Sequence, residues 1–135
     1  FVDMKELVMN DYYHPLMKGS GSIKDVVDAA WCSEPSLHEY KECKKYVDRN
    51  QADELVSPDE ALPGKNINGV VERIASGTDA VNAYQRMMYG VDADRTKEAR
   101  GAWERLLLKY CKLDTAAMVM VWRHWKKLTE ETHGE

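Results

Sequence analysis

The sequence predicts an all-α protein, a single compact domain of six or seven short helices. Helix caps recur along the chain, whereas alternating Val, Ile and Thr patterns typical of strands are nearly absent. The length of 135 residues fits one domain, predicted to span 1–135 and large enough to bury a substantial core. We expect flexible segments at 18–22 and 62–67 and a flexible tail after 129.

Serine caps open the helices predicted in the first half of the chain. Ser22 and Asp25 have capping-box spacing, and so do Ser36 and Glu39, so a helix is expected to begin at each serine. Pro58 suits the first turn of a further short helix, because its missing N–H is not needed there. The predicted helices of this half cover 2–13, 23–31 and 37–50, and the stretch from 58 to 61 adds at most a single helical turn.

Glycine and aspartate delimit the helices predicted in the second half. Gly77 and Gly90 follow amphipathic stretches, at the position where a helix C-terminus favours glycine. We expect Asp92 or Asp94 to cap the most regular helix and Asp114 to cap the last one. The predicted helices of this half cover 68–76, 78–89, 95–113 and 115–131.

Composition argues against nucleic-acid binding and against a membrane span, and it favours binding to other proteins. A net charge of −4 and a pI of about 5.6 provide no basic field for nucleic acid. The longest apolar run, 116–122, is far shorter than the roughly 20 residues of a membrane span, so we expect no transmembrane segment. A peripheral place on a membrane complex stays open. The content of 4 Trp, 7 Tyr and 7 Met is typical of surfaces that bind other proteins.

The last predicted helix is apolar around most of its circumference. Such a helix is either central in the core or docked on a partner, and both interpretations stay open. The candidate partner surface comprises Met118, Trp122, Arg123, Trp125 and Lys126. The predicted hydrophobic centre comprises Trp103, Leu106, Leu107, Tyr110, Met118, Val121 and Trp122.

Three cysteines are candidates for a disulfide. Along one unbroken helix, Cys32 and Cys43 would lie about 16 Å apart, so they can pair only if the chain folds back between them. A bond from either one to Cys111 is geometrically easier, and three cysteines allow at most one bridge. A nucleophilic role for Cys32 or Cys43 is less favoured, because Glu34 and two further glutamates nearby disfavour a thiolate.

No motif predicts a catalytic, cofactor-binding or metal site. The four histidines are scattered, no Cys-x-x-Cys pair exists and no glycine-rich phosphate loop precedes a helix. Residues 92–104 begin like a calcium loop, but Lys97 and Trp103 stand where glycine and glutamate are needed. We therefore predict neither an enzyme nor a cofactor.

One segment resembles a known family. In "LHEYKEC", Leu37, Tyr40 and Cys43 share a face, and Cys32 lies upstream. This pattern resembles the first helix of the coiled-coil-helix-coiled-coil-helix family, the twin Cys-x9-Cys proteins. The resemblance implies a disulfide-tied helical hairpin, a mitochondrial location and a role as an accessory subunit of a respiratory complex. The chain departs from the pattern because ten residues separate the two cysteines and a second pair is missing.

Together these features predict a non-enzymatic accessory or scaffolding subunit whose partners are other protein subunits. Its predicted location is the mitochondrion, in association with the respiratory chain. The alternative is a free-standing helical binding module, either a secreted effector or a small-ligand carrier, which a pocket lined by Met and Trp would favour. A cysteine-dependent enzyme is the third interpretation, and a reactive thiol would favour it.

Overall fold

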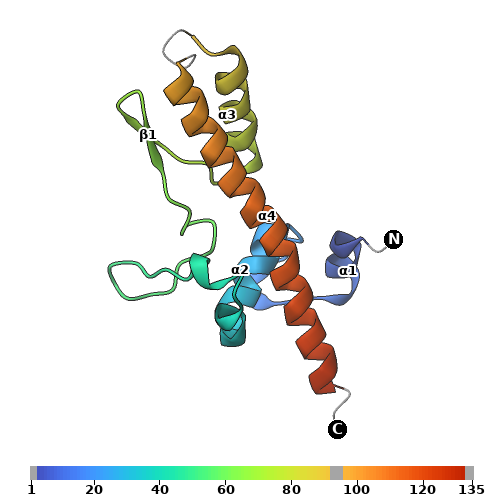
Figure 1. Ribbon diagram of the computed structural model, residues 1–135. Coiled ribbons are helices and arrows are strands. Elements are labelled where there is room, and N and C mark those ends of the chain that lie inside the picture. The colour runs from blue at the N-terminus through green and yellow to red at the C-terminus, as the bar shows by residue number, and fades with distance from the viewer. Residues whose placement is uncertain (1–2, 92–95, 133–135) are drawn as a thin grey trace. The chain divides into compact units, whose positions relative to one another are not determined.

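The computed structural model describes residues 3–91 and 96–132. Within these ranges lie four α-helices, three short 3-10 helices and one two-stranded antiparallel sheet (Figure 1). The chain is mostly helical, but the prediction of an all-α fold with six or seven short helices is wrong. Contacts divide the chain into two units, Phe1–Pro58 with Thr115–Glu135 and Asp59–Asp114, which are described in turn.

The first unit contains α1 (Met4–Asp11), α2 (Ile23–Ser33) and the C-terminal part of α4 (Lys97–Thr132). Ser22 caps α2 as predicted: its Oγ accepts a hydrogen bond from the Asp25 N–H at 3.3 Å and donates to the Asp25 carboxylate at 2.6 Å. The two helices are short, so their stability comes mainly from the faces that they bury in this unit.

The core of the first unit forms around Trp31 of α2. This side chain is fully buried, and its Nε1 donates a hydrogen bond to the Val56 carbonyl at 3.2 Å. Met118 and Trp122, which we placed in the hydrophobic centre, are 52% and 56% exposed, so that part of the prediction is wrong. The other buried apolar residues of the unit are Val8, Met17, Val26, Val27, Ala29, Ala30, Leu37, Cys43, Tyr46, Ala117, Met120 and Val121.

Short 3-10 helices replace the α-helix predicted over 37–50. They are η2 (Pro35–Glu39) and η3 (Lys44–Tyr46), while a third 3-10 helix, η1 (Pro15–Met17), lies between α1 and α2. Ser36 does not begin an α-helix, because the Glu34 carboxylate caps η2 and accepts the Ser36 N–H at 3.3 Å. The buried side chains of this stretch are Leu37, Cys43 and Tyr46, separated by multiples of three, which is the period of a 3-10 helix. The short helix predicted from 58 is a turn.

The second unit contains a β-hairpin, α3 (Gly77–Tyr89) and the N-terminal part of α4. Strands β1 (Lys65–Ile67) and β2 (Val70–Glu72) pair antiparallel, where we predicted a flexible segment and a helix over 68–76. The helix prediction is wrong because Asn68 and Gly69 adopt φ values of +54° and +83°. Two consecutive left-handed residues form the tight turn that suits a two-residue hairpin loop.

An apolar cluster between the hairpin, α3 and α4 stabilises the second unit. Trp103 is its largest member, only 2% exposed, and the segments of α3 and α4 that contribute to it run side by side in Figure 1. The remaining buried members are Ile67, Ile74, Ala83, Ala99, Ala102 and Leu106, with Leu107 and Tyr110 partly buried against them. The predicted centre is therefore borne out for Trp103 and Leu106, while Val121 belongs to the first unit.

Helix α4 is one helix of 36 residues, not two helices separated by an Asp114 cap. The buried positions Leu113, Ala117 and Met120 continue at spacings of four and three across this point, so nothing in the apolar pattern ends the helix. Thr96 caps α4, with its Oγ1 accepting the Ala99 N–H at 3.1 Å. The predicted caps Asp92 and Asp94 lie outside the described residues.

The helix also continues to Thr132, through the start of the tail expected after 129. Its length exceeds that of a membrane span, but charged side chains recur along it. Among the described residues, no helix combines the length and the apolar composition needed to cross a membrane.

Candidate functional site

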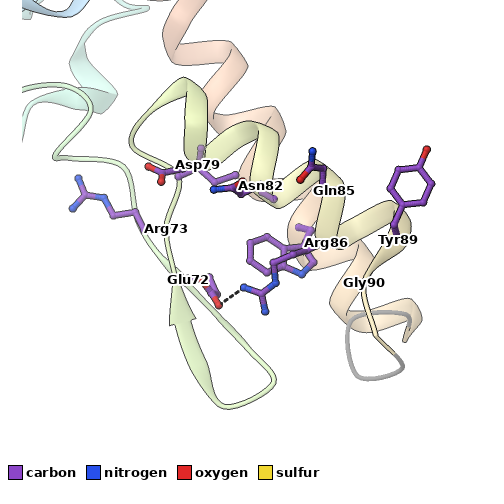
Figure 2. Close-up of a pocket in the computed structure, with 11 residues that line it drawn as sticks. Glu72, Arg73, Asp79, Asn82, Gln85, Arg86, Tyr89 and Gly90 are labelled. Atoms are coloured by element: carbon purple, nitrogen blue, oxygen red, sulfur yellow. Dashed lines mark hydrogen bonds and ion pairs between the residues drawn. The ribbon is translucent and has the colours of Figure 1, made fainter.

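A polar groove of about 620 Å³ lies in the second unit, between α3 and the segment formed by β2 and the residues after it. Figure 2 shows Glu72 and Arg73 on the hairpin side, with Asn82, Gln85 and Tyr89 on α3. These side chains supply amide, hydroxyl and charged groups to one concave surface, which can therefore form hydrogen bonds with a polar ligand.

Arg86 crosses this groove from α3 to β2. Its Nη1 lies 2.8 Å from Glu72 Oε1, and its guanidinium lies 4.6 Å from the centroid of the Trp103 ring (Figure 2). The ion pair and the cation–π contact hold Arg86 in place and balance its charge. Trp103 also lines the groove, and its Nε1 is buried with no hydrogen-bond partner among the described residues. A buried N–H of this kind is destabilising until an acceptor reaches it.

The other two charged residues of the groove differ in their partners. Asp79 is part of the α3 cap: its carboxylate accepts the Ala75 N–H at 3.2 Å, and its own N–H donates to Ser76 Oγ at 3.1 Å. Arg73 donates from Nη2 to the Asp59 carbonyl at 2.6 Å, which is a neutral acceptor. Among the described residues, none of the ion pairs includes Arg73, so its charge is available to an acidic group.

The described residues offer little for covalent or metal chemistry. They contain no group of three His, Cys, Asp or Glu side chains arranged to hold a metal ion. The groove residues named above are hydrogen-bonding and charged groups, without a cysteine or serine nucleophile beside a histidine base. The arrangement supports reversible binding of a polar ligand.

The predicted cysteines occupy three different settings. Cys32 lies in the last turn of α2 and is exposed, Cys43 is fully buried beside η3, and Cys111 is exposed on α4 in the second unit. All three are thiols in this structure. Partial desolvation of Cys32 and full burial of Cys43 raise the pKa of these two thiols, with a nearby carboxylate adding to the effect, so neither is activated as a nucleophile.

The predicted partner surface divides into exposed and engaged residues. Met118 and Trp122 lie one turn apart on α4 and are 52% and 56% exposed. Lys126 follows on the same stripe, with its Nζ 5.5 Å from the centroid of the Trp122 ring. We call Met118, Trp122 and Lys126 the α4 ridge. These three side chains form an apolar surface with a basic end.

Arg123 and Trp125 are occupied inside the first unit. Arg123 pairs with Glu42, and its guanidinium lies 3.9 Å from the centroid of the Tyr40 ring. Trp125 packs against Tyr12 with ring centroids 5.7 Å apart. These two residues therefore stabilise the unit and are not part of the α4 ridge.

A small apolar pocket of about 270 Å³ lies beside Trp125, between α1 and α4 of the first unit. The Tyr12 hydroxyl is 2.9 Å from His124 Nε2, while His124 Nδ1 and Trp125 Nε1 are buried with no hydrogen-bond partner among the described residues. Burial lowers the pKa of His124 and raises that of Tyr12, which favours the neutral form of each. Sequence reasoning did not identify this cluster, because residues 12 and 124 are distant in the chain.

No known protein family matches this chain, and neither the curated proteins nor the solved structures include a significant match. The groove was also missed from the sequence, because Arg73 lies in a stretch that we predicted to be helical. The Asn68-Gly69 pair was the signal that could have located the hairpin, and with it one wall of the groove.

Proposed function

We propose that this protein is a non-enzymatic subunit of a larger protein assembly and that another polypeptide docks on it. The observation that carries the proposal is the exposure of Trp122 on the α4 ridge. Tryptophan is the side chain most often responsible for binding energy at protein interfaces. A tryptophan that is 56% exposed beside a methionine that is 52% exposed forms an apolar surface that a partner protein would cover.

Further exposed apolar side chains support the same proposal. On α3 of the second unit, Val81, Tyr84 and Met88 are 56%, 50% and 40% exposed. Their spacing of three and four residues places them on one stripe of the helix. A second apolar stripe of this kind is consistent with a protein that contacts its assembly through more than one surface. The mitochondrial location and the respiratory-chain association stay predictions of the sequence, and this proposal does not depend on them.

Two observations favour the alternative of a small-ligand carrier, the polar groove of the second unit and the pocket beside Trp125. The pocket beside Trp125 is apolar, and the buried Nε1 of Trp125, which lines it, has no hydrogen-bond partner among the described residues, as in a ligand site. Its volume of about 270 Å³ is, however, at the lower limit of the roughly 300–1,000 Å³ typical of ligand pockets. The groove of the second unit is large enough, but the Arg86–Glu72 ion pair already crosses it, so we rank this function second.

Two tryptophan substitutions test the proposed function. Trp122→Ala should weaken retention of co-purifying subunits at least tenfold, because an interface tryptophan typically contributes about 2 kcal/mol or more. The melting temperature of the isolated chain should change little, since most of this side chain faces solvent. Trp125→Ala is the matched control: its ring packs on Tyr12, so it should lower the free energy of unfolding by about 3 kcal/mol.

The measurements are thermal unfolding of each isolated variant and quantitative recovery of partner chains with tagged protein from its native source. Purification of the wild-type protein as a lone monomer would contradict the proposal. So would a Trp122→Ala variant that loses stability as severely as Trp125→Ala while its remaining folded fraction still binds every partner.

A further inference from the structure

The hairpin of the second unit has one open edge. A sheet of two strands, β1 and β2, leaves the far side of β2 without a neighbouring strand among the described residues. Val70 and Val71 of β2 are 57% and 72% exposed, so neither a helix nor a loop covers them. An exposed apolar edge strand is a template on which another extended chain can pair.

The register shows which backbone groups point outward. Ile67 pairs with Val70 across a loop of two residues, so these two residues exchange the hydrogen bonds that close the hairpin. Because hydrogen-bonded and non-hydrogen-bonded pairs alternate, the N–H and C=O of Val71 point away from β1. Among the described residues, the N–H groups of Val71 and Arg73 have no acceptor. They lie two residues apart, which is the repeat of a strand edge.

Charge and side-chain chemistry define what would pair here. Arg73 lies two residues after Val71, directly past the end of β2, and atoms of both side chains lie beside Gly64, so both project to the same face. The only described acceptor of the Arg73 guanidinium is the neutral Asp59 carbonyl. A chain that paired with β2 would therefore gain an ion pair by placing a carboxylate opposite Arg73 and apolar contact by placing a β-branched residue opposite Val71.

We propose that the outer edge of β2 accepts an extended, acidic segment of a partner protein as a third strand. This inference deepens the proposed function and rests on it, because it names the kind of polypeptide that one surface of the subunit recognises. The partner backbone bonds to the outward N–H and C=O of Val71, and its acidic side chain pairs with Arg73. Strand addition of this kind combines backbone affinity with side-chain specificity.

A second copy of this chain fits the edge less well. If two β2 strands paired antiparallel about Val71, each Arg73 would lie opposite Gly69, and if they paired about Glu72, it would lie opposite Val71. Neither register gives Arg73 a carboxylate. A helix fits poorly as well, because its backbone groups are already bonded internally and cannot meet the outward groups of Val71.

The test uses the whole chain, labelled for amide NMR, and a short capped peptide, acetyl-Thr-Thr-Glu-Thr-Val-Thr-Thr-amide. Antiparallel pairing places its Val opposite Val71 and its Glu opposite Arg73. We expect the amide signals of these two residues to shift at millimolar peptide or below. N-methylation of the peptide Val should weaken binding at least tenfold, whereas N-methylation of the Thr between Glu and Val should leave it within about twofold, because of these two amides only that of Val faces β2.

Variants of the protein provide a second, independent readout. Val71→Pro removes an N–H that the hairpin does not use, so the other amide signals of the second unit should persist while binding falls at least tenfold. Arg73→Glu should bind a peptide with Lys in place of Glu better than the original peptide. No shift at Val71 or Arg73, or an equal response to both methylated peptides, would overturn the inference. The Trp122 test concerns a different surface, so the proposed function can stand when this inference fails.

Discussion

Glu34 provides the most quantitative test of how the first unit is held together. Its carboxylate lies 2.7 Å from the Lys127 ammonium and accepts the Ser36 hydroxyl at 2.6 Å, which joins η2 to α4 within this unit. These hydrogen bonds, with that from Lys127 the strongest, lower the pKa of Glu34 from 4.5 to about 2. The Glu34 side chain is only 12% exposed, so the contacts are largely shielded from water.

The free energy of the interaction can be calculated from that pKa. A difference between 4.5 and about 2 is equivalent to about 3 kcal/mol of preference for the charged form in the folded state. The Lys127 side chain is 41% exposed, so solvent screening reduces this value, and we expect Glu34→Gln to lower the free energy of unfolding by about 2 kcal/mol at pH 7.

The pH dependence has a definite sign. Because the pKa of Glu34 is lower in the folded state, its stabilising contribution is complete above about pH 5 and is lost as the pH falls toward 2. Urea unfolding of the wild type and of Glu34→Gln, followed by tryptophan fluorescence, should therefore give curves that differ at pH 7 and converge near pH 2.

A matched substitution controls for the loss of one negative charge. Glu39 lies 3.4 Å from Lys44, but their side chains are 79% and 60% exposed. Glu39→Gln should change the free energy of unfolding by less than about 0.5 kcal/mol at either pH. Equal effects of the two substitutions, or an effect of Glu34→Gln that does not change between pH 7 and pH 2, would refute the reasoning.

Two further predictions concern the cysteines and the hairpin. A thiol-alkylating reagent should modify the exposed Cys32 and Cys111 in the folded protein but reach the buried Cys43 only on unfolding, as intact mass will report; equal rates for all three would contradict the structure. Gly69→Ala should lower the melting temperature, with a loss of about 1 kcal/mol, because Gly69 has φ of +83°. Gly77→Ala is the control for the hairpin variant: both sites have open space around an added methyl group, but only Gly69 has the left-handed backbone.

Local signals in the sequence located the helix ends that are marked by a capping residue. The Ser22–Asp25 pair gave the start of α2, and Gly90 gave the end of α3, which is confirmed as the C-cap. These signals succeed because the capping hydrogen bonds form between residues close in sequence. A cap does not determine whether the residues after it continue as an α-helix, which is why Ser36 was mistaken for the start of one.

The errors have two physical origins. Leu37, Tyr40 and Cys43 are spaced strictly by three residues, and we took this spacing for the face of an α-helix although 3.6 residues per turn would move these side chains apart. At Asp114, we gave the frequent capping role of aspartate more weight than the apolar pattern, which continues without interruption past this residue. In each case the spacing of the apolar residues predicted the local structure better than the identity of a single polar residue did.

The groove and the open edge of β2 could not be predicted from local signals alone. Their residues come from the hairpin, α3 and α4, and Arg73 and Arg86 acquire their different roles only from the acceptors that surround them. The exposure of Trp122 was likewise undecided in the sequence, since a helix apolar on both sides suits a core and an interface equally well.

The division of the chain into two units has a consequence for the order in which they can form during synthesis. The second unit is continuous in sequence, Asp59–Asp114, whereas the first unit combines residues on both sides of it. Residues 59–114 can therefore complete their core while Trp31 and its neighbours still await Met120 and Val121. Until those residues leave the ribosome, the N-terminal segment exposes apolar surface, so chaperone binding to a nascent chain should be strongest there.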